Sequence, residues 1–339
     1  MTTGNPKRVL VTGGGGFLGS AIVRRLVFRG DRVTSLARKF YGGLESLDVR
    51  QIQADISDIN AVIRACQGMD MVFHTAAKPG VWGKYQDYYR PNVLGTENIV
   101  TACAHHRIPA LIHTSSPSVI FDGSDMEGVD ESRPYPKKHP THYTKTKAMA
   151  EKIVLSAVKE GKIKALVLRP HLIWGPGDPH LAPRVLERAD KLVKVGNRDN
   201  LVDTIFIEDA ATAHILAGDK LAENPDLAGR IYFISQDAPI PMWDMINGIL
   251  RAGGKPPITR TMPAGVVRLV GSLLEGAYKL MGIKTEPPMT RFVAQELATA
   301  HWFNISAAKT DLGYRPQLTI DEGLEQLARW LQARSSDKP

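Results

Sequence analysis

Short apolar runs alternate with longer stretches of helical spacing along the first half of the chain. The runs are rich in β-branched residues, and they predict strands at residues 8–12, 32–36, 50–53, 71–74, 110–114 and 165–169. Between the runs, apolar residues return every three or four positions, which predicts helices at residues 18–29, 58–66, 93–106 and 143–159. Strands that alternate with helices form a parallel sheet with helices on both faces. We therefore predict an α/β fold class, a Rossmann-type doubly wound parallel sheet.

The pattern changes after Pro170, where Pro and Gly become frequent and the periodicity is lost. Strand-like runs at 202–207 and 231–235, with a helical stretch at 209–221 between them, predict a return to the sheet. The remainder is mainly helical. We predict that residues 1–170 and 201–235 form the sheet domain, and that 171–200 and 236–339 form a smaller, mostly helical C-terminal lobe. Ligands of such sheets bind beyond the carboxyl ends of the strands.

Composition narrows the class of protein. Of the 339 residues, 43% are hydrophobic and 23% are charged, as in ordinary globular chains. The two cysteines, Cys66 and Cys103, lie in predicted helices without metal-ligand spacing. They argue against a disulfide framework and a metal site, and they favour a reducing cytoplasm. The polar residues 1–8 do not resemble a secretory signal, and no apolar run is long enough to span a membrane.

The net charge of +8 is spread along the chain. Because no nucleic-acid-binding module is recognisable, we predict no nucleic-acid partner. A basic solvated surface is one explanation of the charge, and a preference for anionic ligands is the other.

A glycine-rich loop links the first predicted strand to the first predicted helix. Its glycines have the spacing G-x-x-G-x-x-G, which allows a tight turn and brings backbone N–H groups close to a pyrophosphate at the positive end of the helix. Such spacing also suits a flexible turn, but the strand before it and the helix after it favour dinucleotide binding. The predicted cofactor contacts in this loop are Gly13, Gly16, Phe17, Leu18 and Gly19.

The end of the second strand bears on which dinucleotide is bound. NAD-preferring sites carry an acidic residue there for the ribose 2′-hydroxyl, whereas this chain has Ala37 followed by Arg38 and Lys39. A guanidinium suits a 2′-phosphate, so we predict NADP(H) in preference to NAD(H), with Arg38 as a cofactor-binding residue. A solvated strand end is the alternative. Asp55, before Ile56 at the end of the third strand, is a candidate for the adenine amine or a simple turn carboxylate.

Tyr143 and Lys147 lie one helical turn apart, and therefore on one face of the predicted helix. A free tyrosine has a pKa of about 10, and a nearby ammonium is expected to lower that pKa. The phenol would give its proton to a carbonyl oxygen in reduction and take it back in oxidation. Ser116, after the strand at 110–114, is the candidate hydroxyl that polarises the same oxygen. Ser115 and Ser118 are alternatives, and any of the three serines could cap a turn instead.

Together these motifs resemble the extended short-chain dehydrogenase/reductases. The resemblance rests on TGGGGFLG at 12–19, FHTAA at 73–77, NVLGT at 92–96, TSSPSV at 114–119, YTKTK at 143–147, LRP at 168–170 and LGYRP at 312–316. It implies that Ser116, Tyr143 and Lys147 are the catalytic set, and that Lys147 also binds the nicotinamide ribose.

The same resemblance implies further contacts with the cofactor. Pro170 and His171 are expected beside the nicotinamide ring, and Asn92 is expected to brace the site from the neighbouring helix. Ala76, Asp55 and Ile56 complete the expected cofactor-binding set. Two departures stand out: Ala37 replaces the usual acidic residue, and residues 119–121 read Val-Ile-Phe where sugar-nucleotide epimerases typically carry Val-Tyr-Gly.

Within that family the sequence is most similar to the 3β-hydroxysteroid dehydrogenase branch. The likeness is carried by AAKPGVWG at 76–83, SPSV at 116–119, RPHLIWGPGD at 169–178 and NLVD at 200–203. The branch includes the bacterial 2-alkyl-3-oxoalkanoate reductases, which these strings most resemble. The resemblance implies an NADP(H)-dependent oxidoreductase that interconverts a 3-oxo and a 3-hydroxy group on a large apolar substrate bearing a carboxylate. The alternatives are a 3β-hydroxysteroid or sterol-4-carboxylate 3-dehydrogenase, a sugar-nucleotide epimerase or dehydratase, and a non-catalytic dinucleotide-binding protein.

Several residues are candidates for contacts with such a substrate. Lys78 or Lys84, after the fourth strand, would meet the carboxylate, with a surface lysine as the alternative. Trp82 and Trp174 are candidate pocket walls, although large aromatics often belong to the core. Residues 265–281 are apolar apart from one polar stripe, which suits an acyl-channel wall, a peripheral membrane contact or an amphipathic helix packed on the core.

We expect a cytoplasmic protein, which would be membrane-associated if residues 265–281 lie on a bilayer. A homodimer agrees with the resemblance, but no motif in the sequence establishes one.

Overall fold

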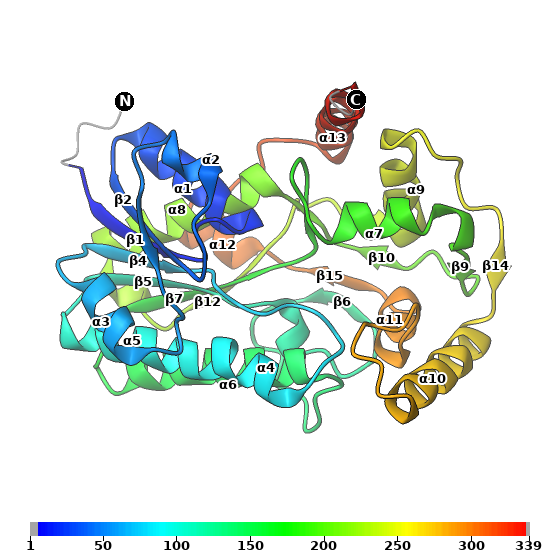
Figure 1. Ribbon diagram of the computed structural model, residues 1–339, viewed down its shortest axis with the longest axis horizontal. Coiled ribbons are helices and arrows are strands. Elements are labelled where there is room, and N and C mark those ends of the chain that lie inside the picture. The colour runs from blue at the N-terminus through cyan, green and yellow to red at the C-terminus, as the bar shows by residue number, and fades with distance from the viewer. Residues whose placement is uncertain (1–5, 337–339) are drawn as a thin grey trace.

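Seven parallel strands form the central sheet of the computed structural model, which describes residues 6–336 (Figure 1). Their order across the sheet is β12-β7-β5-β4-β1-β2-β3. The strands are β1 (Arg8–Thr12), β2 (Arg32–Ala37), β3 (Arg50–Gln53), β4 (Met71–His74), β5 (Ala110–Thr114), β7 (Ala165–Pro170) and β12 (Ile231–Ile234). All six strands predicted for the first half are present, and their bounds differ from the predictions by at most one residue. The predicted fold class is confirmed.

Two layers of helices cover the sheet, because side chains along each strand alternate between its faces. Val9 and Val11 of β1 pack in one hydrophobic cluster with α1, whereas Leu10 packs in the other with α3 and α5. Figure 1 shows α1 and α8 on one side of the sheet and α3, α5 and α6 on the other. The helices and turns of this half are α1 (Phe17–Arg29), α2 (Gly42–Glu45), α3 (Ile59–Cys66), α4 (Tyr85–Tyr89), the π-helical turn Arg90–Leu94, α5 (Gly95–His105), the 3-10 turn Pro117–Val119, α6 (His142–Lys159) and α8 (Ile207–Glu223).

The rest of the chain contains more strands than expected. A second, four-stranded sheet has the order β13-β10-β15-β6, and two two-stranded pairs accompany it. These strands are β6 (Met126–Val129), β8 (Ile173–Trp174), β9 (Lys194–Val195), β10 (Leu201–Val202), β11 (Ile205–Phe206), β13 (Ile240–Pro241), β14 (Thr261–Met262) and β15 (His301–Phe303). The helices and turns are α7 (Leu181–Glu187), Ala189–Lys191, Pro225–Leu227, α9 (Met242–Ala252), α10 (Ala264–Leu280), α11 (Arg291–Leu297), α12 (Ser306–Asp311) and α13 (Ile320–Ser336).

The strand predicted at 202–207 is corrected by the structure. It is two short strands, and neither joins the central sheet: β10 pairs with β13 and β15, and β11 pairs with β8. Asp203 separates them, because its buried carboxylate accepts a hydrogen bond from the Phe303 amide (2.7 Å) and pulls the chain toward β15. The strand predicted at 231–235 does join the central sheet, as β12 beside β7.

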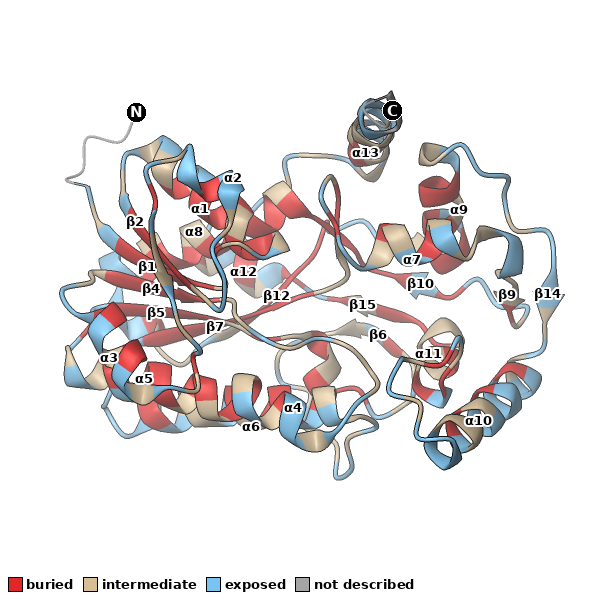
Figure 2. Ribbon diagram, in the orientation of Figure 1, coloured by how far each residue is buried: buried red, intermediate tan, exposed pale blue. Residues whose placement is uncertain are grey.

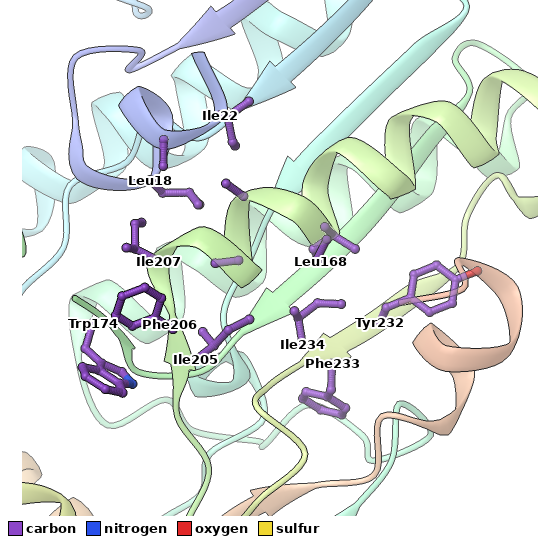
Figure 3. Packing of buried hydrophobic residues seen from close by; sticks show 14 of the residues in the cluster. Leu18, Ile22, Leu168, Trp174, Ile205, Phe206, Ile207, Tyr232, Phe233 and Ile234 are labelled. Atoms are coloured by element: carbon purple, nitrogen blue, oxygen red, sulfur yellow. The ribbon is translucent and has the colours of Figure 1, made fainter. Parts of the chain in front are cut away.

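Trp174 belongs to the core and does not line a pocket, which corrects one of the two candidate walls. Its side chain is fully buried and meets Phe206 edge to face, with 5.3 Å between ring centroids (Figure 3). Gly323 of α13 also packs against Trp174, and a Cβ atom at this position would lie 2.7 Å from the indole ring. The close approach of α13 to this ring therefore requires a glycine at position 323.

In Figure 2 the strands of the central sheet are mostly buried, whereas α10 has many exposed residues. Within residues 6–336, no helix has the length and apolarity that a membrane span requires. In the same range, no three His, Cys, Asp or Glu side chains are grouped as a metal site would need. Cys66 and Cys103 are buried free thiols.

Candidate active site

The glycine loop between β1 and α1 makes a turn that only glycine accommodates. Gly13 has a positive φ of 69°, and its amide donates to the Leu36 carbonyl (2.8 Å). A Cβ atom on Gly13 would lie 3.1 Å from the Ala76 backbone, and one on Gly19 would lie 2.2 Å from the Gly13 carbonyl oxygen. The loop, Ala76 and the start of α1 are therefore packed backbone to backbone.

The start of α1 fits a pyrophosphate. No side chain caps the helix at Gly16, and its first turn contains no acidic residue. The first amides of a helix have no acceptor within it, so those of Phe17 and Leu18 remain available to an anion. Leu18 itself is buried and anchors the turn to the core.

The end of β2 carries an exposed basic residue and no acidic one. Ala37 closes the strand, and Arg38 is exposed and forms no salt bridge within residues 6–336. Burial opposes ionisation of Asp55, but hydrogen bonds from Ser57 and the charges of Arg90 and Arg38 outweigh it and lower the pKa of Asp55. The carboxylate is held at its own turn, where its oxygen accepts from the Ser57 amide (2.8 Å). The turn interpretation of Asp55 thus has direct structural support.

Asn92 braces the loop that follows β4. Its side-chain oxygen accepts from the Lys78 amide (2.7 Å), and its amide nitrogen donates to the Lys78 carbonyl (3.2 Å) and to the Thr146 hydroxyl (3.1 Å). The side chain is buried in the π-helical turn before α5. It therefore connects the β4 loop to α6, the helix that carries Tyr143 and Lys147.

The start of α6 places Tyr143 beside Ser116. Thr141 and Thr144 form a reciprocal capping box, which fixes where the helix begins. The Ser116 hydroxyl lies close enough to the Tyr143 phenol to act on its pKa. Both side chains line one cavity of about 590 Å³. The structure thus brings together the two hydroxyl groups that the sequence predicts to hold one oxygen atom.

Lys147 lies one turn further along α6, at the carboxyl end of β5. Its ammonium donates to the Thr114 carbonyl (2.6 Å), and its side chain is only 3% exposed. Burial lowers the pKa of Lys147 to about 8, although the Glu151 carboxylate opposes that shift.

The predicted lowering of the tyrosine pKa is wrong for this structure. Burial raises the pKa of Tyr143 above its ordinary value, and it outweighs the opposing effect of Ser116. The reason is geometric: the Lys147 ammonium is directed to the Thr114 carbonyl, and Glu296 adds to the effect of burial on the phenol. The phenol is therefore protonated at neutral pH.

A buried carboxylate that sequence reasoning missed holds α6 in register. Glu151 is fully buried and forms a salt bridge with Arg169 of β7, which is 1% exposed. The same carboxylate accepts hydrogen bonds from the hydroxyl groups of Ser115 and of Tyr135 (2.7 Å). Glu151 follows Lys147 by four residues, so an acidic residue one further turn along the same helix face was the available signal.

This network separates the three candidate serines. The Ser115 hydroxyl donates to Glu151 and is committed there. Ser116 also accepts from the Ser118 amide (3.2 Å), so it caps a turn and lines the cavity at once. Ser118 lines the same cavity, and its hydroxyl has no hydrogen-bond partner among the described residues.

Comparison with known proteins agrees with this site. The sequence profile of the 3-beta hydroxysteroid dehydrogenase/isomerase family matches residues 10–262. The chain belongs to this family. The predicted family resemblance is confirmed, and with it the prediction of an oxidoreductase acting on CH–OH and C=O groups.

Similar curated proteins of the 3-beta hydroxysteroid dehydrogenase/isomerase family fall into two groups. A 2-alkyl-3-oxoalkanoate reductase of Shewanella oneidensis is 47% identical over 94% of this chain and 84% of its own. Another, of Stenotrophomonas maltophilia, is 43% identical over 94% of this chain and 98% of its own. The human sterol-4-alpha-carboxylate 3-dehydrogenase, decarboxylating, is 34% identical over 94% of this chain and 87% of its own.

Solved structures share the fold. The crystal structure of gox2253 has a TM-score of 0.78 at 24% identity and covers 97% of this chain and 98% of its own. The UDP-glucuronic acid 4-epimerase of Bacillus cereus, in complex with NAD, has a TM-score of 0.73 at 23% identity and covers 96% of this chain and 99% of its own.

The cavity beside Tyr143 has apolar, histidine and charged walls. His171, whose ring is 3.3 Å from that of His301, follows Pro170 at the end of β7. Burial holds the pKa of His171 well below its ordinary value, so the ring is neutral. The walls include Val81, Phe121, Phe292, His171, His301, Arg184, Arg188, Glu187 and Glu296. Sequence reasoning missed the charged members, because they belong to α7 and α11, far along the chain.

The predicted carboxylate-binding lysines do not line this cavity. The Lys78 ammonium lies over the Tyr88 ring, 5.4 Å from its centroid, and Lys84 is exposed at the start of α4. Trp82 does face a hollow, since it lines an adjoining cavity of about 780 Å³. Of the two tryptophans predicted to form pocket walls, Trp82 therefore remains a candidate.

Removing the Glu151 carboxylate should destabilise the fold more than any exposed charge on α6. Glu151→Ala leaves Arg169 buried without a partner, so we expect a loss of about 3–5 kcal/mol in the free energy of unfolding. Glu160→Ala, at the exposed end of the same helix, is the matched control and should leave the free energy of unfolding nearly unchanged. Chemical denaturation measures both, and equal losses would contradict a structural role for the buried pair.

Proposed function

We propose that the chain is an NADP(H)-dependent reductase of the 3-oxo group of 2-alkyl-3-oxo acids. The observation that carries this proposal is that Tyr143 and Ser116 line the same cavity of about 590 Å³. The relatives named for this activity are more similar to the chain than those named sterol 3-dehydrogenases. A 3β-hydroxysteroid or sterol-4-carboxylate 3-dehydrogenase is the second candidate.

The proposed catalytic set is Ser116, Tyr143 and Lys147. A reduced nicotinamide, when bound, supplies the hydride that reaches the 3-oxo carbon. Ser116 and Tyr143 donate hydrogen bonds to the ketone oxygen, and Tyr143 gives that oxygen its proton as the negative charge develops. The raised pKa of Tyr143 keeps its proton in place at neutral pH, which suits the reductive direction. Lys147, whose ammonium donates to the Thr114 carbonyl, would bind the nicotinamide ribose.

The proposed cofactor site extends from the glycine loop to the end of β7. Gly13, Gly16, Phe17, Leu18 and Gly19 would hold the pyrophosphate, and Arg38 the 2′-phosphate. The remaining proposed contacts are Asp55, Ile56, Ala76, Asn92, Pro170 and His171. Apart from His171 these residues lie in 1–170, and we propose that 1–170 together with α8 and β12 forms the dinucleotide-binding domain.

The shape of the substrate site favours a branched molecule. The cavity beside Tyr143 and the adjoining cavity beside Trp82 share Val81, Phe121 and Phe292. A 2-alkyl-3-oxo acid carries two chains that diverge at neighbouring carbons, so each chain could follow one hollow. The proposed substrate lobe, 171–200 and 236–339, supplies Arg184, Phe292 and Glu296 to these walls.

Helix α10 presents an apolar face that no described residue covers. Val266, Leu269, Val270, Leu273 and Leu280 are 41–90% exposed. Of the polar residues of the helix, Glu275 is buried, whereas Arg268, Ser272 and Lys279 are exposed. Glu275 bonds to Arg291, and Lys279 lies over the Trp82 ring. An amphipathic helix packed on a core would show the opposite arrangement.

We propose that this face rests on a lipid surface that carries anionic headgroups. Its flanks bear Arg268, Lys279 and Lys284, whereas Glu275 is paired with Arg291 and Glu286 with Arg184. Apolar residues with a basic rim are the composition of interfacial helices. Glu275 and Lys279 also line the cavity beside Trp82, so an apolar substrate could leave the lipid close to its binding site.

The first prediction of this proposal concerns turnover. With NADPH, the wild type should reduce a synthetic 2-alkyl-3-oxo acid faster than it turns over a sterol carboxylate with NADP⁺, as followed by the absorbance of the reduced nicotinamide. Tyr143→Phe should lose roughly 10²–10⁴-fold in kcat because the proton donor is gone, while cofactor binding persists. Tyr89→Phe on the neighbouring α4 is the control. Full activity of Tyr143→Phe would remove Tyr143 from the mechanism.

Cofactor preference should depend on Arg38. Arg38→Gln removes a charged contact with the 2′-phosphate, so we expect KM for NADPH to rise about tenfold or more while KM for NADH stays nearly constant. Arg32→Gln, at the other end of β2, is the matched control. A wild type that uses NADH as well as NADPH, or a variant with unchanged KM values, would contradict the NADP(H) preference.

Vesicle binding should depend on the exposed face of α10. The wild type should sediment with vesicles rich in phosphatidylglycerol, and less of it should do so at high salt. The Leu269→Ser, Leu273→Ser double variant should bind the same vesicles roughly tenfold less tightly. Phe28→Ser removes an equally exposed apolar side chain elsewhere and serves as the control. If the wild type stays unbound and instead forms a dimer that the double variant abolishes, the face is a homodimer contact and the lipid proposal is wrong.

A further inference from the structure

Glu296 is a carboxyl group in the cavity wall that the proposed mechanism does not use. It lies in the last turn of α11, in the same wall as Tyr143 and Ser118. Its main-chain carbonyl accepts from the His301 ring (2.8 Å), but its side chain has no hydrogen bond or salt bridge within residues 6–336. A carboxyl group without a protein partner at this place is available to a ligand.

The surroundings of Glu296 favour its neutral form. Burial raises the pKa of Glu296 to about 8, and the Arg184 charge opposes that shift. The titratable and charged groups facing the same cavity are Tyr143, His171, His180, Arg184, Glu187, Arg188, Glu286 and His301. Arg184 is already paired with Glu286, and His171 and His301 are neutral because burial lowers the pKa of each ring. At neutral pH Glu296 therefore carries a proton that it can donate.

Ser118 offers a second donor in the same wall. Ser118 lines the cavity, and its buried hydroxyl has no hydrogen-bond partner within residues 6–336. Its amide donates to Ser116, so the two serines are held in one turn. A buried hydroxyl without a partner is costly, and a ligand oxygen would satisfy it.

We infer that Glu296 and Ser118 form the headgroup subsite: a neutral carboxylic acid and a hydroxyl that both donate hydrogen bonds to the carboxylate of the substrate. This inference rests on the proposed function, because it deepens the assignment of a 3-oxo acid as substrate. It also replaces Lys78 and Lys84 as the carboxylate-binding residues.

The geometry of the substrate requires a subsite close to the catalytic hydroxyls. In a 3-oxo acid the carboxylate carbon is two bonds from the ketone carbon, so it must lie within a few ångströms of the groups that hold the ketone oxygen. Hydrogen bonds between an acid and a carboxylate are short and strong. A bound carboxylate also raises the pKa of a neighbouring acid, so the substrate itself would help to keep the Glu296 proton in place.

The test compares the acid with its methyl ester across pH. For the wild type and the acid, kcat/KM should fall above about pH 8, because ionised Glu296 repels the carboxylate. Lys147, whose pKa is also about 8, acts on both substrates. The quantity to compare is therefore the ratio of kcat/KM for the acid to kcat/KM for the uncharged ester, and this ratio should fall above about pH 8 in the wild type. Glu296→Gln keeps a donor but cannot ionise, so it should bind the acid at pH 7 and lack the fall. Glu296→Ala should raise KM for the acid about tenfold with little change for the ester.

Two controls separate the subsite from folding and from the proposed function. Glu187→Gln removes another carboxyl of the same cavity and should keep the wild-type profile, and ester turnover shows that each variant is folded. If Glu296→Gln retains the fall in this ratio, or if Glu296→Ala binds the acid as the wild type does, the subsite is wrong although the reductase assignment stands. A wild type that reduces the ester or a sterol but no 3-oxo acid contradicts both.

Discussion

The buried pair of Glu151 and Arg169 fixes the register of α6 against the central sheet, and the candidate active site depends on that register. Tyr143, Lys147 and Glu151 follow one another at intervals of four residues. Glu151 binds β7 through Arg169 and the β5 loop through Ser115, Lys147 binds the last carbonyl of β5, and Tyr143 meets Ser116. Because each residue turns a helix by about 100°, a shift of one position would take all three contacts away together.

The sheet and the glycine loop could be predicted from the sequence because their signals are local. Buried parallel strands are short, continuous apolar runs, and residues 13–19 form a turn whose geometry requires glycine. The Tyr143–Lys147 spacing and Ser116 were likewise visible in short motifs. The run at 202–207 misled because a buried hydrogen bond from Phe303 to Asp203 splits it, a contact made across about a hundred residues.

The substrate side of the site could not be predicted in the same way. Lys78 and Lys84 were chosen because they follow β4, but the charged side chains that line the cavity include Arg184 and Glu187 of α7 and Glu296 of α11. Trp174 was chosen for its size, which also makes it a core residue beside Phe206. The pKa of Tyr143 moved opposite to expectation because burial outweighs an ammonium that is directed elsewhere. Each error concerns either the direction in which a side chain points or its contact with residues far along the chain. The spacing of residues in the sequence does not determine either.

The C-terminal lobe contributes both to the walls of the cavity and to an exposed apolar surface, and an apolar carboxylic acid substrate would use both. The inner walls combine apolar side chains with a few polar groups near Tyr143, as small-molecule sites commonly do. The outer face of α10 is apolar, and the same helix reaches the cavity beside Trp82 through Glu275 and Lys279. A path from a lipid surface to the catalytic hydroxyls would therefore run along one helix.

The most direct test of this account is a crystal structure of the protein with NADP⁺ and a 2-alkyl-3-oxo acid. The account predicts the ketone oxygen within about 2.6–3.2 Å of both the Tyr143 and the Ser116 hydroxyls, with the Lys147 amine at the nicotinamide ribose. A ketone oxygen held by other groups, with the Tyr143 hydroxyl remote from it, would contradict the central claim.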